Sequence, residues 1–215
     1  MRTSQHSWMP ASRTFVLLSA MLTGAVALGA LQDGRSSESP HMPAKTAKTM
    51  TKAQKIANAM TAGPMSISAN ATILDWPPDE KSQPTVLKPG SNGWSCLPDM
   101  PDTKGNDPMC IDEPWMKWVE AYTSKRTPNI GHVGIGYMLA PGGAWESNTD
   151  PYAMRETPDN HWGYHRPHLM IVVPDLKALD GISTDPNNGG PYVMYAGTQY
   201  AHIMAPVTSE AMPRR

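Results

Sequence analysis

The sequence is poor in phenylalanine, cysteine and charge. It has one phenylalanine and two cysteines among 215 residues, and its 18 Lys and Arg residues nearly balance 19 Asp and Glu residues. Nucleic-acid-binding domains carry a clustered basic surface, so we expect no nucleic-acid partner. Sixteen methionines stand against the single phenylalanine. They predict a core in which Met replaces Phe and Leu, or thioether ligands for a soft metal ion.

Several familiar catalytic motifs are missing as well. There is no G-x-S-x-G nucleophile elbow, no H-E-x-x-H zinc motif and no glycine-rich phosphate loop. The two cysteines, Cys96 and Cys110, do not form the C-x-x-C spacing of redox-active pairs. The sequence therefore predicts no particular reaction.

The N-terminal segment has the pattern of an export signal, residues 1–30. Arg2 and Arg13 provide positive charge, and residues 15–30 are apolar or small. This run is shorter than the roughly 20 residues of a membrane-spanning helix. An uncleaved anchor is the alternative. We expect an exported protein, periplasmic or extracellular, with no membrane span beyond this segment.

Export gives the two cysteines a simple interpretation. In an oxidising compartment, Cys96 and Cys110 are expected to pair with each other as a structural disulfide. The 13 residues between them are rich in Pro, Asp and Gly, so they need such a link to hold a defined shape.

The rest of the chain divides into three parts. Residues 31–64 are expected to form a flexible tether with a short helix that Thr51 caps and Gly63-Pro64 ends. Residues 65–210 are expected to form a single domain, and residues 211–215 a tail. The many prolines and glycines, 22 and 17, predict short elements and long ordered loops.

The domain is expected to belong to the α+β class, with a mainly antiparallel sheet and one principal packed helix. Residues 66–74 alternate like a half-buried strand, and residues 85–88 and 94–97 resemble a hairpin. The helix, 113–124, follows an N-cap at Asp112 and places Trp115 and Trp118 on one apolar stripe.

Residues 189–207 are the pattern around which the domain is expected to be built. The runs 192–196 and 199–207 flank Gly197-Thr198, which suits a two-residue type II′ turn. This register pairs Tyr195 with Tyr200 and Val193 with His202. One face of the hairpin then carries apolar bulk with polar tips.

Three candidate strands each combine an apolar face with a face of histidine and methionine. The strands are 131–139, 167–174 and 199–207, and the second face carries His132, Met138, His168, Met170, His202 and Met204. Gly134 and Gly136 are expected to leave room there for a ligand. Imidazole with thioether suits copper. The alternative is that this face packs under a helix and its histidines bond to the backbone.

A second histidine cluster lies at the end of the long loop 144–166. His161, His165 and His168 offer a zinc site that Glu146, Asp150 or Asp159 would complete. Gly163 and Pro167 argue against the helix that would align the first two. The alternative is that these residues anchor the loop to the sheet.

Five short segments carry a resemblance to known sequences. They are residues 92–99 (NGWSCLPD), 106–110 (NDPMC), 147–151 (SNTDP), 167–170 (PHLM) and 191–194 (PYVM). Through them the chain resembles a family of uncharacterised exported bacterial proteins with no assigned activity. The resemblance implies export and a shared domain, and it transfers no catalytic residues.

Three functions are consistent with these patterns. The favoured one is a non-enzymatic exported module that binds a small ligand or metal on the His/Met/Tyr sheet face. The second is a secreted metal-dependent hydrolase that uses His161, His165 and His168. The third is a structural envelope protein in which every pattern above is packing. An open His-bearing face distinguishes the first from the third.

Overall fold

The computed structural model describes residues 50–79, 82–101 and 103–208, which fall within one compact unit, Glu38–Arg215. The predicted export signal and C-terminal tail lie outside the described residues. No helix in the described ranges is long and apolar enough to cross a membrane.

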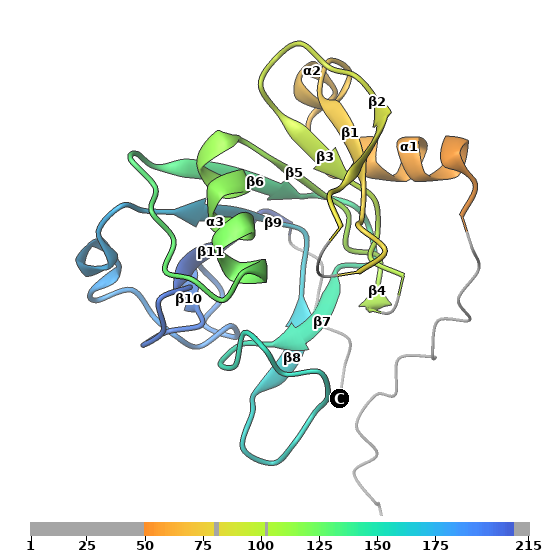
Figure 1. Cartoon of the computed structure of the whole chain (residues 1–215). Helices are drawn as coiled ribbons and strands as arrows, with labels where there is room; N and C mark the ends of the chain where they lie inside the picture. The colour runs from red at the N-terminus through yellow and green to blue at the C-terminus, as the bar shows by residue number, and fades with distance from the viewer. Residues whose placement is uncertain (1–49, 80–81, 102, 209–215) are drawn as a thin grey trace, which may run out of the picture. The chain divides into compact units, whose positions relative to one another are not determined.

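An eight-stranded sheet forms the centre of the unit, in the order β10-β11-β9-β6-β5-β3-β1-β2 (Figure 1). Its strands are β1 (Thr72–Asp75), β2 (Thr85–Lys88), β3 (Ser95–Leu97), β5 (Met109–Ile111), β6 (Gly134–Met138), β9 (His168–Val172), β10 (Tyr192–Met194) and β11 (His202–Pro206). All neighbours are antiparallel except β1 and β3. The predicted α+β class with a mainly antiparallel sheet is confirmed.

A second sheet has three short strands, in the order β4-β7-β8. They are β4 (Lys104–Gly105), β7 (Ala144–Ser147) and β8 (Trp162–His165), all antiparallel. Two of these strands lie in the segment that the sequence suggested was a loop, 144–166. The loop between them, residues 148–161, is correspondingly shorter.

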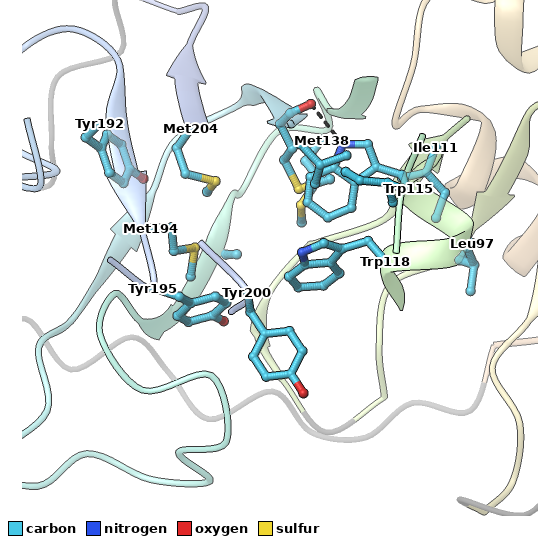
Figure 2. Packing of buried hydrophobic residues seen from close by; sticks show 14 of the residues in the cluster. Leu97, Ile111, Trp115, Trp118, Met138, Tyr192, Met194, Tyr195, Tyr200 and Met204 are labelled. Atoms are coloured by element: carbon cyan, nitrogen blue, oxygen red, sulfur yellow. Dashed lines mark hydrogen bonds between the residues drawn. The ribbon is translucent and has the colours of Figure 1, made fainter. Parts of the chain in front are cut away.

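Helix α3 (Glu113–Thr123) covers one face of the large sheet, across β6 and β9 (Figure 1). Asp112 caps it as predicted, because its Oδ1 accepts a hydrogen bond from the Trp115 amide, and its Oδ2 accepts one from the Ile135 amide of β6. Figure 2 shows Trp115 and Trp118 beside the methionines of the sheet, where both rings are buried. The helix is therefore fixed to the sheet at its first turn and along its aromatic stripe.

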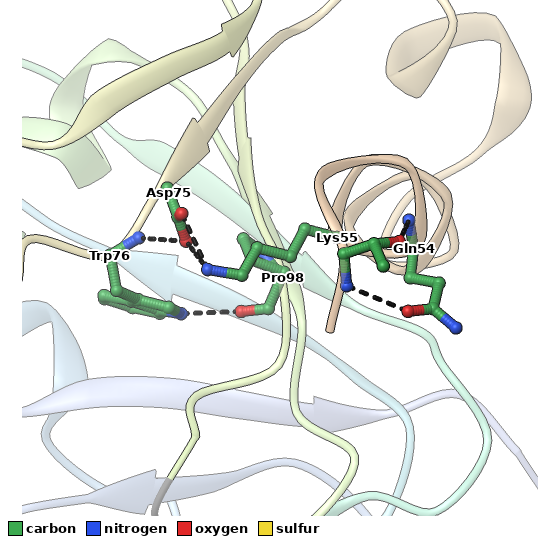
Figure 3. A network of polar contacts seen from close by, with 6 residues as sticks. Gln54, Lys55, Asp75, Trp76 and Pro98 are labelled. Atoms are coloured by element: carbon green, nitrogen blue, oxygen red, sulfur yellow. Dashed lines mark hydrogen bonds and ion pairs between the residues drawn. The ribbon is translucent and has the colours of Figure 1, made fainter. Parts of the chain in front are cut away.

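The opposite face of the sheet carries the disulfide and helix α1 (Lys52–Met60). Cys96 and Cys110 face each other across β3 and β5 and are bonded, as predicted. Ala59 and Ala62 pack with them in one buried cluster. Lys55 forms an ion pair with Asp75 of β1, 2.7 Å between Nζ and Oδ2 (Figure 3). The predicted helix is thus present, and it belongs to the folded core.

Two strand predictions near the start of the domain were wrong. Residues 66–74 do not form one strand, since helix α2 (Met65–Ser68) precedes β1. The strands β2 and β3 do not form a hairpin with each other. Each pairs with β1 instead, β2 antiparallel and β3 parallel. The alternating residues of these two strands and the glycine-rich turn between them fit a hairpin. They fit equally well two strands that pair on either side of a third.

The two edges of the large sheet differ. Strand β2 ends the sheet on one side, and its Val86 is 53% exposed. Strand β10 ends the other side, where the Val193 amide donates a 2.7 Å hydrogen bond to the carbonyl of Ser183. The short 3-10 helix η1 (Leu176–Leu179) packs nearby through Leu179.

Candidate functional site

The terminal hairpin exists, but its register differs from the prediction by one residue. His202 pairs with Met194 and Met204 with Tyr192. Residues 195–201 form a longer turn, and Tyr195 adopts a left-handed conformation with φ 56°. Non-glycine residues rarely adopt this conformation, so nothing in the composition of the run indicated it.

The predicted histidine and methionine face is real, but it is closed. Five of the six proposed residues lie on the α3 side of the sheet and are buried: Met138, His168, Met170, His202 and Met204. Figure 2 shows Met138, Met194 and Met204 in the interior between Tyr192 and the two tryptophans of α3. The sixth, His132, is exposed before β6 and lies near Glu113 at the start of α3.

The space expected at Gly134 and Gly136 is filled by helix α3. A Cβ atom at Gly134 would lie 2.7 Å from Pro114 Cβ, and one at Gly136 would lie 2.8 Å from Met170 Cε. The Trp115 indole N–H donates a 3.1 Å hydrogen bond to the Met170 carbonyl on the same surface. These glycines therefore allow the helix to approach the sheet and do not admit a ligand.

The two buried histidines of this face are neutral and bonded to the backbone. The Nδ1 atom of His168 lies 2.5 Å from the carbonyl of Arg166, and that of His202 lies 2.9 Å from the carbonyl of Tyr200. A carbonyl only accepts, so Nδ1 carries the proton in both rings. Burial lowers the pKa of each to about 4. Both rings therefore remain uncharged near neutral pH.

The second predicted cluster does not converge. His161 is exposed before β8, whereas His165 is buried at its end. Four residues of extended chain separate them by about 13 Å. Within the described ranges, no group of three or more His, Cys, Asp or Glu side chains is arranged to hold a metal ion.

His165 instead joins a different group, the inter-sheet cluster of Glu146, His165, Tyr192 and Tyr195. Glu146 and His165 come from the inner face of β7 and β8, and Tyr192 belongs to β10. The Nδ1 atom of His165 lies 2.5 Å from the Tyr192 hydroxyl. The Tyr195 hydroxyl acts as a hydrogen-bond donor toward the Glu146 carboxyl. These two contacts connect the small sheet to the edge of the large one.

The Glu146 carboxyl is the most perturbed acid that the structure describes. Burial, with the charge of Asp107 as a smaller cause, raises its pKa to about 7, against the opposing effect of the Tyr195 hydrogen bond. The residue keeps partial exposure, although protein surrounds its carboxyl group. No ion pair to Glu146 occurs among the described residues. A carboxyl group in this state either keeps its proton or needs a cation.

Open space lies on the same side of the small sheet as Glu146, at the residue opposite it. Gly163 is directly opposite Glu146 in the β7–β8 ladder, so both face the same side of the small sheet. A Cβ atom at Gly163 would meet nothing within 4 Å. The glycine thus leaves the inner face of the small sheet open next to Glu146.

Two further features of the cluster are a strained backbone and an unpartnered ring nitrogen. Tyr195 has a left-handed backbone, and its amide N–H donates a 2.9 Å hydrogen bond to the Asn148 carbonyl. Strain of this kind is concentrated at functional sites. The Nε2 atom of His165, like that of His168 under α3, is buried and has no hydrogen-bond partner in the part of the chain that the structure describes. Its pKa is lowered to about 3, mainly by burial, so the ring is neutral.

A groove of about 650 Å³ lies on the other side of β10 and β11, between η1 and the turn 195–201. Its floor includes Leu179, Val193 and Ala201, all buried. It contains none of the buried titratable groups described above. The groove is therefore a weaker candidate than the cluster.

Comparison with known proteins gave no matching family model, no matching curated protein and no matching solved structure.

Proposed function

We propose that the protein is an exported, non-enzymatic module that binds a small ligand at the inter-sheet cluster. The observation that carries this proposal is the Glu146 carboxyl, which is surrounded by protein, has no ion-pair partner among the described residues, and lies beside the open space at Gly163. A buried ionisable group with a strongly shifted pKa that borders open space is a candidate for a functional site.

Export is supported by two features. Residues 1–30 have the charge and apolar pattern of a signal segment. The Cys96–Cys110 disulfide is of the kind that persists in oxidising compartments.

The ligand site is moved from the face that the sequence favoured. His168 and His202 are 1% and 3% exposed beneath α3, so a ligand there would have to displace the helix. His165 and Glu146 occupy the neighbouring sheet, where a glycine keeps one side open. The cluster therefore combines buried histidine and tyrosine side chains with an open side at Gly163.

The proposal is tested by screening small molecules against the full chain and following backbone amide resonances by NMR. The panel contains cationic, anionic and neutral compounds of similar size. We expect at least one class to shift the Gly163, Glu146 and Tyr195 amides in a saturable way. Gly163→Val fills the open space and is expected to abolish these shifts. Gly131→Val is the matched control, since a Cβ there also meets nothing within 4 Å.

Three results would overturn the proposal. No saturable shift at the cluster from any class would favour a purely structural envelope protein. Shifts confined to Val193 and Ala201 would place binding in the groove by η1 instead. Turnover of an ester or peptide that requires zinc and is lost in His165→Ala would support the metal-dependent hydrolase and refute a non-enzymatic role.

A further inference from the structure

We infer that the ligand of the inter-sheet cluster is a small organic cation, an alkylammonium ion, whose charged group pairs with the Glu146 carboxylate. This inference depends on the proposed function, because it assumes that a ligand enters beside Gly163. It adds the chemical class of that ligand.

The electrostatics of the site favour a positive charge. Asp107 lies close enough to Glu146 for its charge to disfavour ionisation of Glu146, so two acids contribute negative potential at one place. The charges that act on Glu146 do not include a cation, although the charge of Arg166 acts on the Tyr192 hydroxyl of the same cluster. An anionic ligand would be repelled, and a neutral one would leave the charge uncompensated.

The hydrogen-bonding capacity of the site also suits an ammonium group. A carboxylate has about four acceptor positions, and Tyr195 uses one on Glu146. Two other nearby tyrosine hydroxyls already have partners, since Tyr122 donates to the Pro151 carbonyl at 2.6 Å and Tyr192 is bonded to His165. The remaining acceptor positions are therefore left for a ligand that brings several N–H donors.

Three tyrosine hydroxyls lie near the same carboxyl. The charge of Glu146 raises the pKa of Tyr122, Tyr192 and Tyr195, although burial is the larger cause in each. Both ring faces of Tyr122 are covered, by Trp118 and by Tyr152. The tyrosines therefore offer hydroxyl oxygens, which can accept hydrogen bonds from an ammonium group.

The binding should depend on pH in a defined direction. The Glu146 pKa of about 7 means that the carboxyl is mostly protonated below this pH and ionised above it. The groups near it are Asp107, the hydroxyls of Tyr122, Tyr192 and Tyr195, and the His165 ring near the Glu146 backbone. The charge of Arg166 also acts on Tyr192. Affinity for an alkylammonium ion is therefore expected to rise between about pH 6 and pH 8.

The test compares butylammonium with 1-butanol, which has the same length and no charge, by NMR titration of the full chain. At about pH 8 we expect butylammonium to bind at the Gly163 and Tyr195 amides at least about tenfold more tightly than 1-butanol. Glu146→Gln should remove this preference. Glu156→Gln is the matched control, because Glu156 bonds to Trp145, whose ring points to the outer face of the same sheet.

The results separate the two proposals. If 1-butanol binds as tightly as butylammonium, or if Glu146→Gln keeps the preference, the cation class is wrong while the ligand site stands. If Glu156→Gln removes the preference as fully as Glu146→Gln, a diffuse field and not the paired carboxylate is responsible. If neither compound nor any member of the wider panel perturbs the cluster, the ligand site itself is refuted.

Discussion

The buried histidines and Glu146 change the stability of the fold with pH in opposite directions. His165, His168 and His202 have pKa values lowered to about 3, 4 and 4 by burial, so folding favours their neutral forms. Glu146 has a raised pKa, so folding favours its protonated form. The histidines therefore stabilise the fold above their ordinary pKa of 6.5, and this stabilisation is lost as the pH falls toward 4. The contribution of Glu146 is present at low pH and is lost as the pH rises through about 7.

His202 offers a test of the acid side. Between pH 6.5 and about 4 the unfolded chain binds a proton at this position and the folded chain does not, so the free energy of unfolding falls on acidification. Each such proton contributes a slope of roughly 1.4 kcal/mol per pH unit. We expect His202→Phe to flatten the slope in urea unfolding measured across this range. His161→Phe, at an exposed histidine, should leave the slope unchanged, and an equal effect of both would contradict the assignment.

The residue patterns predicted which side chains share a face, but not which face is covered. Alternation placed His168 with Met170 and His202 with Met204, and the structure keeps both pairs together. The side opposite His168, with Leu169 and Ile171, was expected to be the core, yet those residues are only half-buried. A histidine can be buried beside methionine when a backbone carbonyl accepts a hydrogen bond from its imidazole N–H. The sequence of a single strand does not show whether such a carbonyl will be present.

At the scale of elements, α3 was the most predictable part and β7–β8 the least. Asp112, Pro114 and the tryptophan stripe are local signals that together indicate a helix start and a packing face. Strands β7 and β8 have four residues each and contain Gly163, so neither reaches the length at which alternation is informative. The sequence suggested Glu146 only as one possible additional zinc ligand. Its neighbours Tyr195 and Gly163 are distant in the chain, and no local pattern predicts the strand pairings that bring them close to it.

The cap of α3 provides a test at this scale. Asp112 accepts hydrogen bonds from the helix at Trp115 and from β6 at Ile135, so it fixes the helix to the sheet. Asp112→Ala removes both acceptors and should lower the free energy of unfolding by about 2 kcal/mol. Asp175→Ala removes only the exposed cap of η1, where Oδ1 accepts from the Lys177 amide, and should have a smaller effect. Equal losses in chemical denaturation would show that the link to β6 is unimportant.

At the scale of the whole molecule, the disulfide stabilises the side of the sheet away from α3. It connects adjacent strands β3 and β5 and closes a loop with a sequence separation of 14. Replacing Cys96 and Cys110 together by Ala should lower the free energy of unfolding by about 3 kcal/mol. Reductant should destabilise the wild type by a similar amount and leave the double variant unchanged. A reductant effect on the double variant would show that this loss has another origin.

The sequence predicted which elements the molecule contains better than it predicted how the strands pair. The fold class, the principal helix and the disulfide follow from local patterns and from chemistry that pairs two cysteines. The strand order does not, because β1 lies between β2 and β3, and β9 between β6 and β11. The pairs β1 with β3, β6 with β9 and β9 with β11 are separated by long segments of chain. The one-residue shift at Tyr195 depends on a backbone conformation that tyrosine seldom takes.

The unlike edges of the large sheet have a consequence for self-association. Growth of a fibre by strand addition requires every copy to offer two free edges, one for each neighbour. In this molecule the Val193 amide on the β10 side already donates a hydrogen bond to the Ser183 carbonyl. On the other side, β2 ends the sheet with an exposed Val86. Contact through β2 would join two copies, and the occupied Val193 amide on the β10 side would hinder addition of a third through the large sheet. The edges of the large sheet therefore favour pairs over growth into a fibre.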